Sequence, residues 1–170
     1  SRGLPDGGLE RGGCGLMQQG ADAARIRATF PAAAEGAAEV GSLQIRARAT
    51  IAGNLTNASP CMDTAPGLLV HDARLRIGGP GGRREAPLTD FFLGGRRTAL
   101  TPDELVTAVV LPPPVPGVRS GFDKIKRTAG HDLALVNAAA AYDPAAGTLR
   151  VAIGSCAVTP AAVPPLRGVT

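Results

Sequence analysis

The sequence predicts an α+β fold, with helices in the first half of the chain and antiparallel strands in the second. Residues 21–40 are rich in alanine and contain Pro31, where a helix can begin, and they are followed by Gly41, where one can stop. Short runs typical of strands recur after residue 73. The proline run 112–116 cannot pair inside a sheet, so we expect it to link two parts of the chain.

The first half of the chain should contain short helices joined by a long loop. We expect two helices within residues 21–40 that meet near Phe30. Residues 46–66 are small and polar without a helical or alternating period, which predicts a loop. Asp63 should then cap a short helix that ends at Leu69, because a carboxylate at the N-cap accepts free amide protons.

The second half of the chain is predicted to form strands. Residues 73–77 and 85–88 predict a hairpin around the glycine turn 78–82, and the β-branched run 105–111 is typical of a buried strand. Three further strands, most economically arranged as an antiparallel meander, are predicted at residues 121–127, 136–142 and 149–155.

Composition excludes several classes of function. The 170 residues carry a net charge of +4, but the basic residues are scattered, and one Tyr, four Phe and no Trp leave few rings for bases to stack on, so we expect no nucleic-acid partner. No apolar stretch approaches the ~20 residues that span a bilayer, so we expect no membrane association. Three widely spaced cysteines fit neither a disulfide framework nor a metal motif, which indicates a soluble cytoplasmic protein.

The most informative candidate site is the segment Thr50, Ile51, Ala52, Gly53 and Asn54. Its small residues let the backbone approach a phosphate or a flat ring, so that amide groups can point at anionic oxygens while the Thr and Asn side chains add donors. A Gly-Asn pair is also common in ordinary turns, so both interpretations stay open at this stage.

Two further polar groups could join such a site. Ser59 and Asp63 could hydrogen-bond sugar or polyol hydroxyls if the segment folds back over a ligand. Lys124 and Lys126 are the only lysines, and alternate strand positions place both on one face. A solvated strand edge explains them, but a compact ammonium in a chain that otherwise uses Arg favours a role for one of them.

Several ordered motifs resemble the FAD-binding subunit of the molybdenum hydroxylases, a family that includes the flavoprotein of xanthine dehydrogenase and the medium subunit of carbon monoxide dehydrogenase. The likeness runs from about Gly7 to Pro160. The segments that carry it are residues 44–55, 57–60, 63–66, 90–94, 97–100 and 102–105, the pattern Phe122-x-Lys124-x-x-Arg127, and residues 132–139.

This resemblance implies an electron-transfer flavoprotein, an oxidoreductase component that uses FAD. Its implied partners are a molybdopterin-binding large subunit and a [2Fe-2S] small subunit. The residues that it implies for cofactor binding are Thr50, Ile51, Ala52, Gly53, Asn54, Ser59, Asp63, Val106 and Lys124, with Val40 where some members place an aromatic ring. It implies that Lys124 approaches the isoalloxazine, where a cation would stabilise the reduced flavin.

The resemblance also implies a division of the chain into residues 1–114, part of an FAD-binding domain, and residues 115–170, part of an antiparallel C-terminal domain. Members of the family carry a further N-terminal subdomain with a second pyrophosphate loop, which we expect to lie outside this sequence. Ala52 stands where Gly is usual, and its methyl group is tolerated only if φ stays negative. The alternative function is a module that docks partner subunits without holding flavin.

Overall fold

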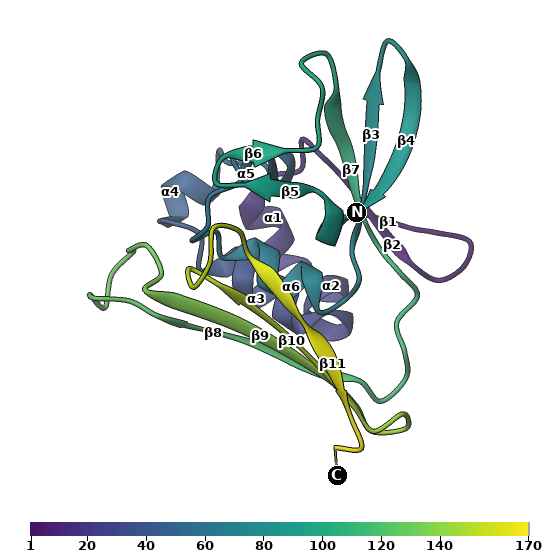
Figure 1. Cartoon of the computed structure of the whole chain (residues 1–170), viewed down its shortest axis with the longest axis vertical. Coiled ribbons are helices and arrows are strands. Elements are labelled where there is room, and N and C mark those ends of the chain that lie inside the picture. Colours follow the sequence, from purple (N-terminus) through teal and green to yellow (C-terminus); the bar gives the residue numbers. More distant parts are fainter. Residues whose placement is uncertain (170) are drawn as a thin grey trace.

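In the computed structural model, which describes residues 1–169, short helices gather between a five-stranded and a four-stranded sheet (Figure 1). Both sheets are antiparallel, and the mixed architecture confirms the predicted α+β class. The helices are α1 (Met17–Asp22), α2 (Ala24–Thr29), α3 (Pro31–Ala38), α4 (Leu43–Arg46), α5 (Ile51–Thr56), α6 (Thr64–Leu69) and the 3-10 helix η1 (Leu88–Asp90).

The first half of the chain contains more helices than predicted. α2 and α3 meet at Phe30 as expected, with Pro31 at the first position of α3, but α1 precedes them. The predicted loop 46–66 is wrong, because α5 lies within it. The Thr50 side chain accepts a hydrogen bond from the Gly53 amide at 3.1 Å and so begins this helix, which at six residues is too short to show a period in the sequence.

The five-stranded sheet contains the predicted hairpin and the predicted buried strand. Its order is β1 (Arg2–Gly3), β2 (Leu9–Gly12), β7 (Leu105–Leu111), β3 (Arg74–Gly79) and β4 (Gly82–Pro87). The first two strands were not predicted. Strands β5 (Phe92–Gly94) and β6 (Arg97–Thr98) form a separate two-stranded sheet.

The four-stranded sheet is the predicted meander with one strand added. Its members are β8 (Arg119–Ile125), β9 (Val136–Asp143), β10 (Thr148–Gly154) and β11 (Ala161–Arg167), which pair in the order β11-β10-β9-β8. β11 was missed because it contains Pro164 and Pro165, which are tolerated there because β11 is the edge strand. Residues 112–118 connect the two sheets, and the domain boundary near residue 114 stays a prediction.

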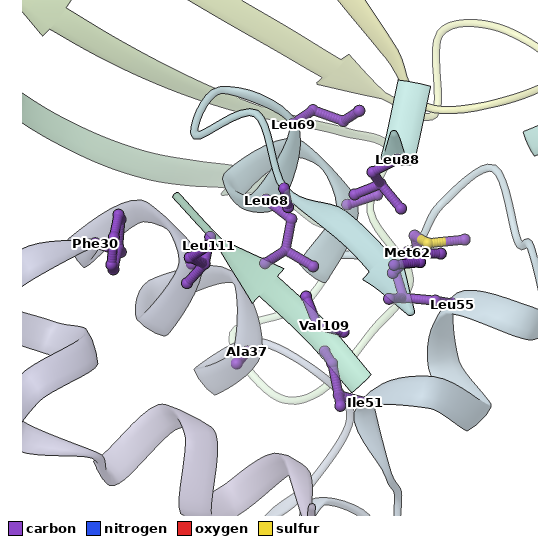
Figure 2. Close-up of a cluster of buried hydrophobic side chains, with 14 of the residues drawn as sticks. Phe30, Ala37, Ile51, Leu55, Met62, Leu68, Leu69, Leu88, Val109 and Leu111 are labelled. Atoms are coloured by element: carbon purple, nitrogen blue, oxygen red, sulfur yellow. The ribbon is translucent and has the colours of Figure 1, made fainter. Parts of the chain in front are cut away.

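Small residues let the helices pack closely against each other. A side chain on Gly67 of α6 would place its Cβ 2.7 Å from the backbone carbon of Ala32 in α3, so this contact requires glycine. α3 and α6 also pack against the four-stranded sheet. On their other side, Figure 2 shows α5, α6 and β7 contributing to one apolar cluster, with Ile51, Leu68 and Val109 among its buried side chains.

Several arginine side chains form ion pairs with glutamates. On the five-stranded sheet, Arg76 pairs with Glu85 at 2.8 Å and with Glu10, and Arg84 pairs with Glu104 at 2.7 Å. The positive charge is therefore partly neutralised within the chain. Across residues 1–169, no helix is long and apolar enough to cross a membrane.

Candidate functional site

The N-terminus of α5 carries the segment that the sequence singled out, but its amides are not free. The amides of residues 51–54 donate at 3.0 to 3.2 Å to the backbone oxygens of Gly15, Gly13 and Thr50 and to Thr50 Oγ1. The predicted cradle of free amides for anionic oxygens is therefore wrong in this structure. Side chains and close approach of the small-residue backbone remain the means by which this segment can bind a ligand.

Asn54 is oriented by a residue that the sequence analysis did not single out. Thr64 Oγ1, in a side chain that is 1% exposed, donates to Asn54 Oδ1 at 2.5 Å. The acceptor end of the Asn54 amide is thereby held toward α6. Among residues 1–169 no hydrogen bond engages its Nδ2 group, and the residue is only half-buried, so Asn54 can donate to a ligand.

Asp63 stands at the start of α6 but does not cap it. Its side chain makes no cap hydrogen bond, and its backbone already has helical angles, φ −81° and ψ −20°. The carboxylate turns instead to the four-stranded sheet, where Oδ2 accepts from Lys124 Nζ at 2.7 Å and Oδ1 accepts from Asn137 Nδ2 at 2.8 Å. The predicted cap is wrong because the carboxylate points toward these two donors, from β8 and β9, and makes no hydrogen bond to the first amides of α6 within residues 1–169.

Burial raises the pKa of Asp63, and the hydrogen bonds from Lys124 and Asn137 oppose that rise. The Lys124 side chain is only 2% exposed, so a solvated strand edge does not describe it. Its ammonium also donates to the Glu39 carbonyl at 3.3 Å, at the C-terminal end of α3, where a cation is favoured. Lys126 lies on the same face and pairs with the Glu39 carboxylate at 2.8 Å.

An open groove of about 260 Å³ lies beside this ion pair. It runs between α3 and β8, and its lining includes Glu35 and Glu39 from the helix and Phe122, Lys124 and Lys126 from the strand and its end. The Lys124 member of the buried pair thus lines a space that can admit part of a ligand.

Asp63, Lys124, Asn137 and the Glu39 carbonyl form one hydrogen-bonded network, and the Asn54–Thr64 pair adjoins it at the next residue of the chain. Within residues 1–169, no described hydrogen bond joins the other predicted residues to it. Ser59 Oγ is partly exposed and accepts from the Cys61 amide at 3.4 Å. Ile51 and Val106 are each 6% exposed and belong to the apolar core, and no hydrogen bond or ion pair described for residues 1–169 joins them to the polar groups. Ala52 has helical backbone with negative φ, so its methyl group causes no strain.

Comparison with known families decides the assignment. Residues 5–114 match the family described as the FAD binding domain in molybdopterin dehydrogenase. The chain belongs to this family. Since the match covers more than half of the 170 residues, including α5, α6 and the Asn54–Thr64 pair, the resemblance read from the sequence motifs is confirmed.

Known relatives agree in sequence and in fold. The chain is 31% identical over 159 residues to the xanthine dehydrogenase FAD-binding subunit of Escherichia coli O157:H7, covering 91% of this chain and 54% of that protein. It is 37% identical over 105 residues to the nicotinate dehydrogenase FAD-subunit of Eubacterium barkeri, covering 60% of this chain and 36% of that protein.

A solved carbon monoxide dehydrogenase from Hydrogenophaga pseudoflava matches with a TM-score of 0.86 at 26% identity, covering 96% of this chain and 56% of that chain. The quinoline 2-oxidoreductase of Pseudomonas putida 86 matches with a TM-score of 0.83 at 26% identity, covering 94% of this chain and 55% of that chain. The chain therefore spans about half the length of the xanthine dehydrogenase subunit and of both solved chains.

Proposed function

We propose that this chain binds FAD at the polar network of α5, α6 and β8 and acts as the electron-transfer flavoprotein component of a molybdenum hydroxylase complex. A molybdopterin-binding large subunit and a [2Fe-2S] small subunit are its proposed partners. The observation that carries the proposal is the buried Asp63–Lys124 pair, which lies next to an open groove in a chain of the FAD-binding family.

The side chains of the network suit the chemistry of FAD. The cofactor offers polyol hydroxyls, a pyrophosphate and a flat ring. Within residues 1–169 the Asn54 NH₂ group has no hydrogen-bond partner and can donate, and the two oxygens of Asp63 keep lone pairs beyond those used by Lys124 and Asn137. The Thr50 hydroxyl and the partly exposed Ser59 hydroxyl add donors at the edge of the same segment.

Lys124 has a different role in this proposal. FAD, when bound, supplies the capacity to accept electrons and pass them on to an acceptor. The ammonium of Lys124 is fixed by Asp63 and by the Glu39 carbonyl, and it is shielded from water. A fixed cation in a site of low dielectric stabilises negative charge gained nearby far more than it would in water.

The proposal is tested by replacing the two polar side chains Asn54 and Asp63 together. In Asn54→Ala/Asp63→Ala, FAD retention should fall, because each lost contact leaves a partner unpaired at about 1–3 kcal/mol, and each 1.4 kcal/mol is about a tenfold change in affinity. The readout is the FAD-to-protein ratio after dialysis, taken from flavin absorbance.

A matched control removes the same residue types away from the network. Asn57→Ala/Asp90→Ala changes two exposed residues and should retain as much FAD as the wild-type chain. Equal FAD retention by the two double variants would contradict the proposed site.

A further inference from the structure

We infer that Asn137 is a positioning residue of the flavin site, which fixes the Asp63 carboxylate so that it can accept hydrogen bonds from the polyol hydroxyls of FAD. This inference rests on the proposed function. Asn137 lies on β9, outside residues 5–114 that match the family of FAD binding domains. Although residues 132–139 carry part of the resemblance, no role was assigned to Asn137 from the sequence.

The amide of Asn137 ties the sheet to the start of α6. The residue is 1% exposed, and its Nδ2 donates to Asp63 Oδ1 at 2.8 Å and to the Met62 carbonyl at 3.2 Å. Both amide hydrogens are therefore used, one on the carboxylate and one on the adjacent backbone. Together they hold the position and the rotation of the Asp63 side chain relative to β9.

This arrangement carries two features that packing alone does not explain. Asn137 Oδ1 is buried without a hydrogen-bond partner within residues 1–169, and an unpaired buried polar group is unfavourable. Directly across from Asn137 in the strand register is Gly154, and a Cβ at that position would collide with Oδ1. An apolar residue at 137 would leave no orphaned acceptor, but it could not donate to Asp63.

The two donors leave acceptor positions on the Asp63 carboxylate that a polyol ligand can use. Asn137 occupies one lone pair of Oδ1, and Lys124 occupies one lone pair of Oδ2. An ionised carboxylate has about four acceptor positions, so one stays available on each oxygen. With the carboxylate held on both sides, these positions are directed before a ligand arrives, which lowers the entropy lost on binding.

Asn137 also keeps the carboxylate in its accepting form. Burial raises the pKa of Asp63, the carboxylate of Glu39 adds to the rise, and the hydrogen bonds of Lys124 and Asn137 oppose it. Removal of the Asn137 donor would raise the pKa of Asp63 further. A protonated Asp63 presents a hydroxyl donor in place of one of its acceptor positions.

The test compares two changes at the same contact with a neighbouring control. Asn137→Ala removes the amide, and Gly154→Ala displaces it without changing its chemistry. The control Ser155→Ala removes a hydrogen bond, Ser155 Oγ to the Ala134 carbonyl at 3.1 Å, from the same end of β10 without touching Asp63. Circular dichroism establishes that each variant folds, and Asn137→Leu, which removes the donor but keeps a similar side-chain volume, replaces Asn137→Ala if that variant does not fold.

Two readouts separate positioning from general damage. The first is the pKa of the Asp63 carboxyl in the cofactor-free chain, followed by carbon NMR, which should rise by about one unit in Asn137→Ala and stay in place in Ser155→Ala. The second is the dissociation constant for FAD, from flavin fluorescence, which should increase about tenfold or more in Asn137→Ala and Gly154→Ala and less than about twofold in the control.

The outcomes distinguish this inference from the function on which it rests. If the wild-type chain binds FAD, and the Asn137 and Gly154 variants bind it with the same affinity and keep the same Asp63 pKa, the positioning role is overturned and the proposed function stands. Absence of FAD binding by the wild-type chain would overturn both.

Discussion

Replacement of Lys124 by methionine should destabilise the chain in a pH-dependent way. The Lys124 and Asp63 side chains are 2% and 7% exposed and lie 2.7 Å apart, so the substitution leaves a buried carboxylate with Asn137 as its remaining donor. Methionine keeps a similar aliphatic stem, which limits the loss of packing. The change therefore isolates the loss of the charge and of its hydrogen bonds.

The expected loss of stability near neutral pH is about 3–5 kcal/mol, the usual range when one partner of a buried pair is removed. The pKa of Asp63 is already raised above 3.8 by burial, and loss of the lysine raises it further. A carboxyl with a raised folded-state pKa contributes stability that is fully present below its unfolded pKa and is lost as pH rises through its folded pKa. The deficit of Lys124→Met should therefore shrink as the pH is lowered.

Urea denaturation of the wild-type chain and of Lys124→Met at about pH 7 and about pH 5 measures this difference. Lys126→Met is the matched control, since Lys126 pairs with a Glu39 side chain that is 38% exposed. This variant should lose less than about 1 kcal/mol of unfolding free energy. A loss of stability for Lys124→Met that equals that of Lys126→Met, or that grows toward low pH, would contradict a buried charge pair between Lys124 and Asp63.

Three other predictions follow from single contacts. Gly67→Ala should cost about 1–3 kcal/mol because its Cβ would press on the backbone of Ala32, whereas Gly81→Ala meets nothing within 4 Å and should be nearly neutral; equal melting temperatures would contradict this. Burial lowers the pKa of His71 from 6.5 to about 4, so its stabilising contribution is present above about pH 6.5 and is lost as pH falls toward about 4. In His71→Gln the free energy of unfolding, measured with urea, should depend less on pH over that range, and an unchanged pH dependence would argue against this. In flavin-loaded protein, Lys124→Met should lower the midpoint potential, and a potential that rises or stays constant would exclude a charge effect of Lys124 on the flavin.

Local pattern was sufficient for six of the strands, β3, β4 and β7 to β10, and for part of the helical half. The hairpin of β3 and β4, the buried strand β7 and the meander of β8 to β10 all follow from short runs bounded by glycine or proline. α5 escaped prediction because its only signal is the Thr50 hydroxyl on the Gly53 amide, three residues on, in a helix with few apolar side chains. An edge strand with two prolines, β11, has no favourable local signal at all.

The site was predicted as a set of residues but not as a network. Asp63 was assigned to a helix cap because its sequence neighbours gave no hint of donors 61 and 74 residues further on. Lys124 drew attention through its rarity, while its burial follows only from the packing of β8 against α3 and α6. Thr64 and Asn137 lie in segments that carry the family resemblance, but their roles have no local signal, since their partners are specified by tertiary contacts.

The central claim, that the chain binds FAD at the Asn54, Asp63 and Lys124 network, is tested most directly by titrating FAD into the isotope-labelled chain and following its NMR spectrum. We expect saturable shifts in the Asn54 side-chain amide, the Asp63 carboxyl and the Lys124 ammonium. Residues of the outer ion pairs on the five-stranded sheet, such as Arg76 with Glu85, should not shift. Shifts confined to those outer ion pairs, or none at the network at saturating FAD, would contradict the claim.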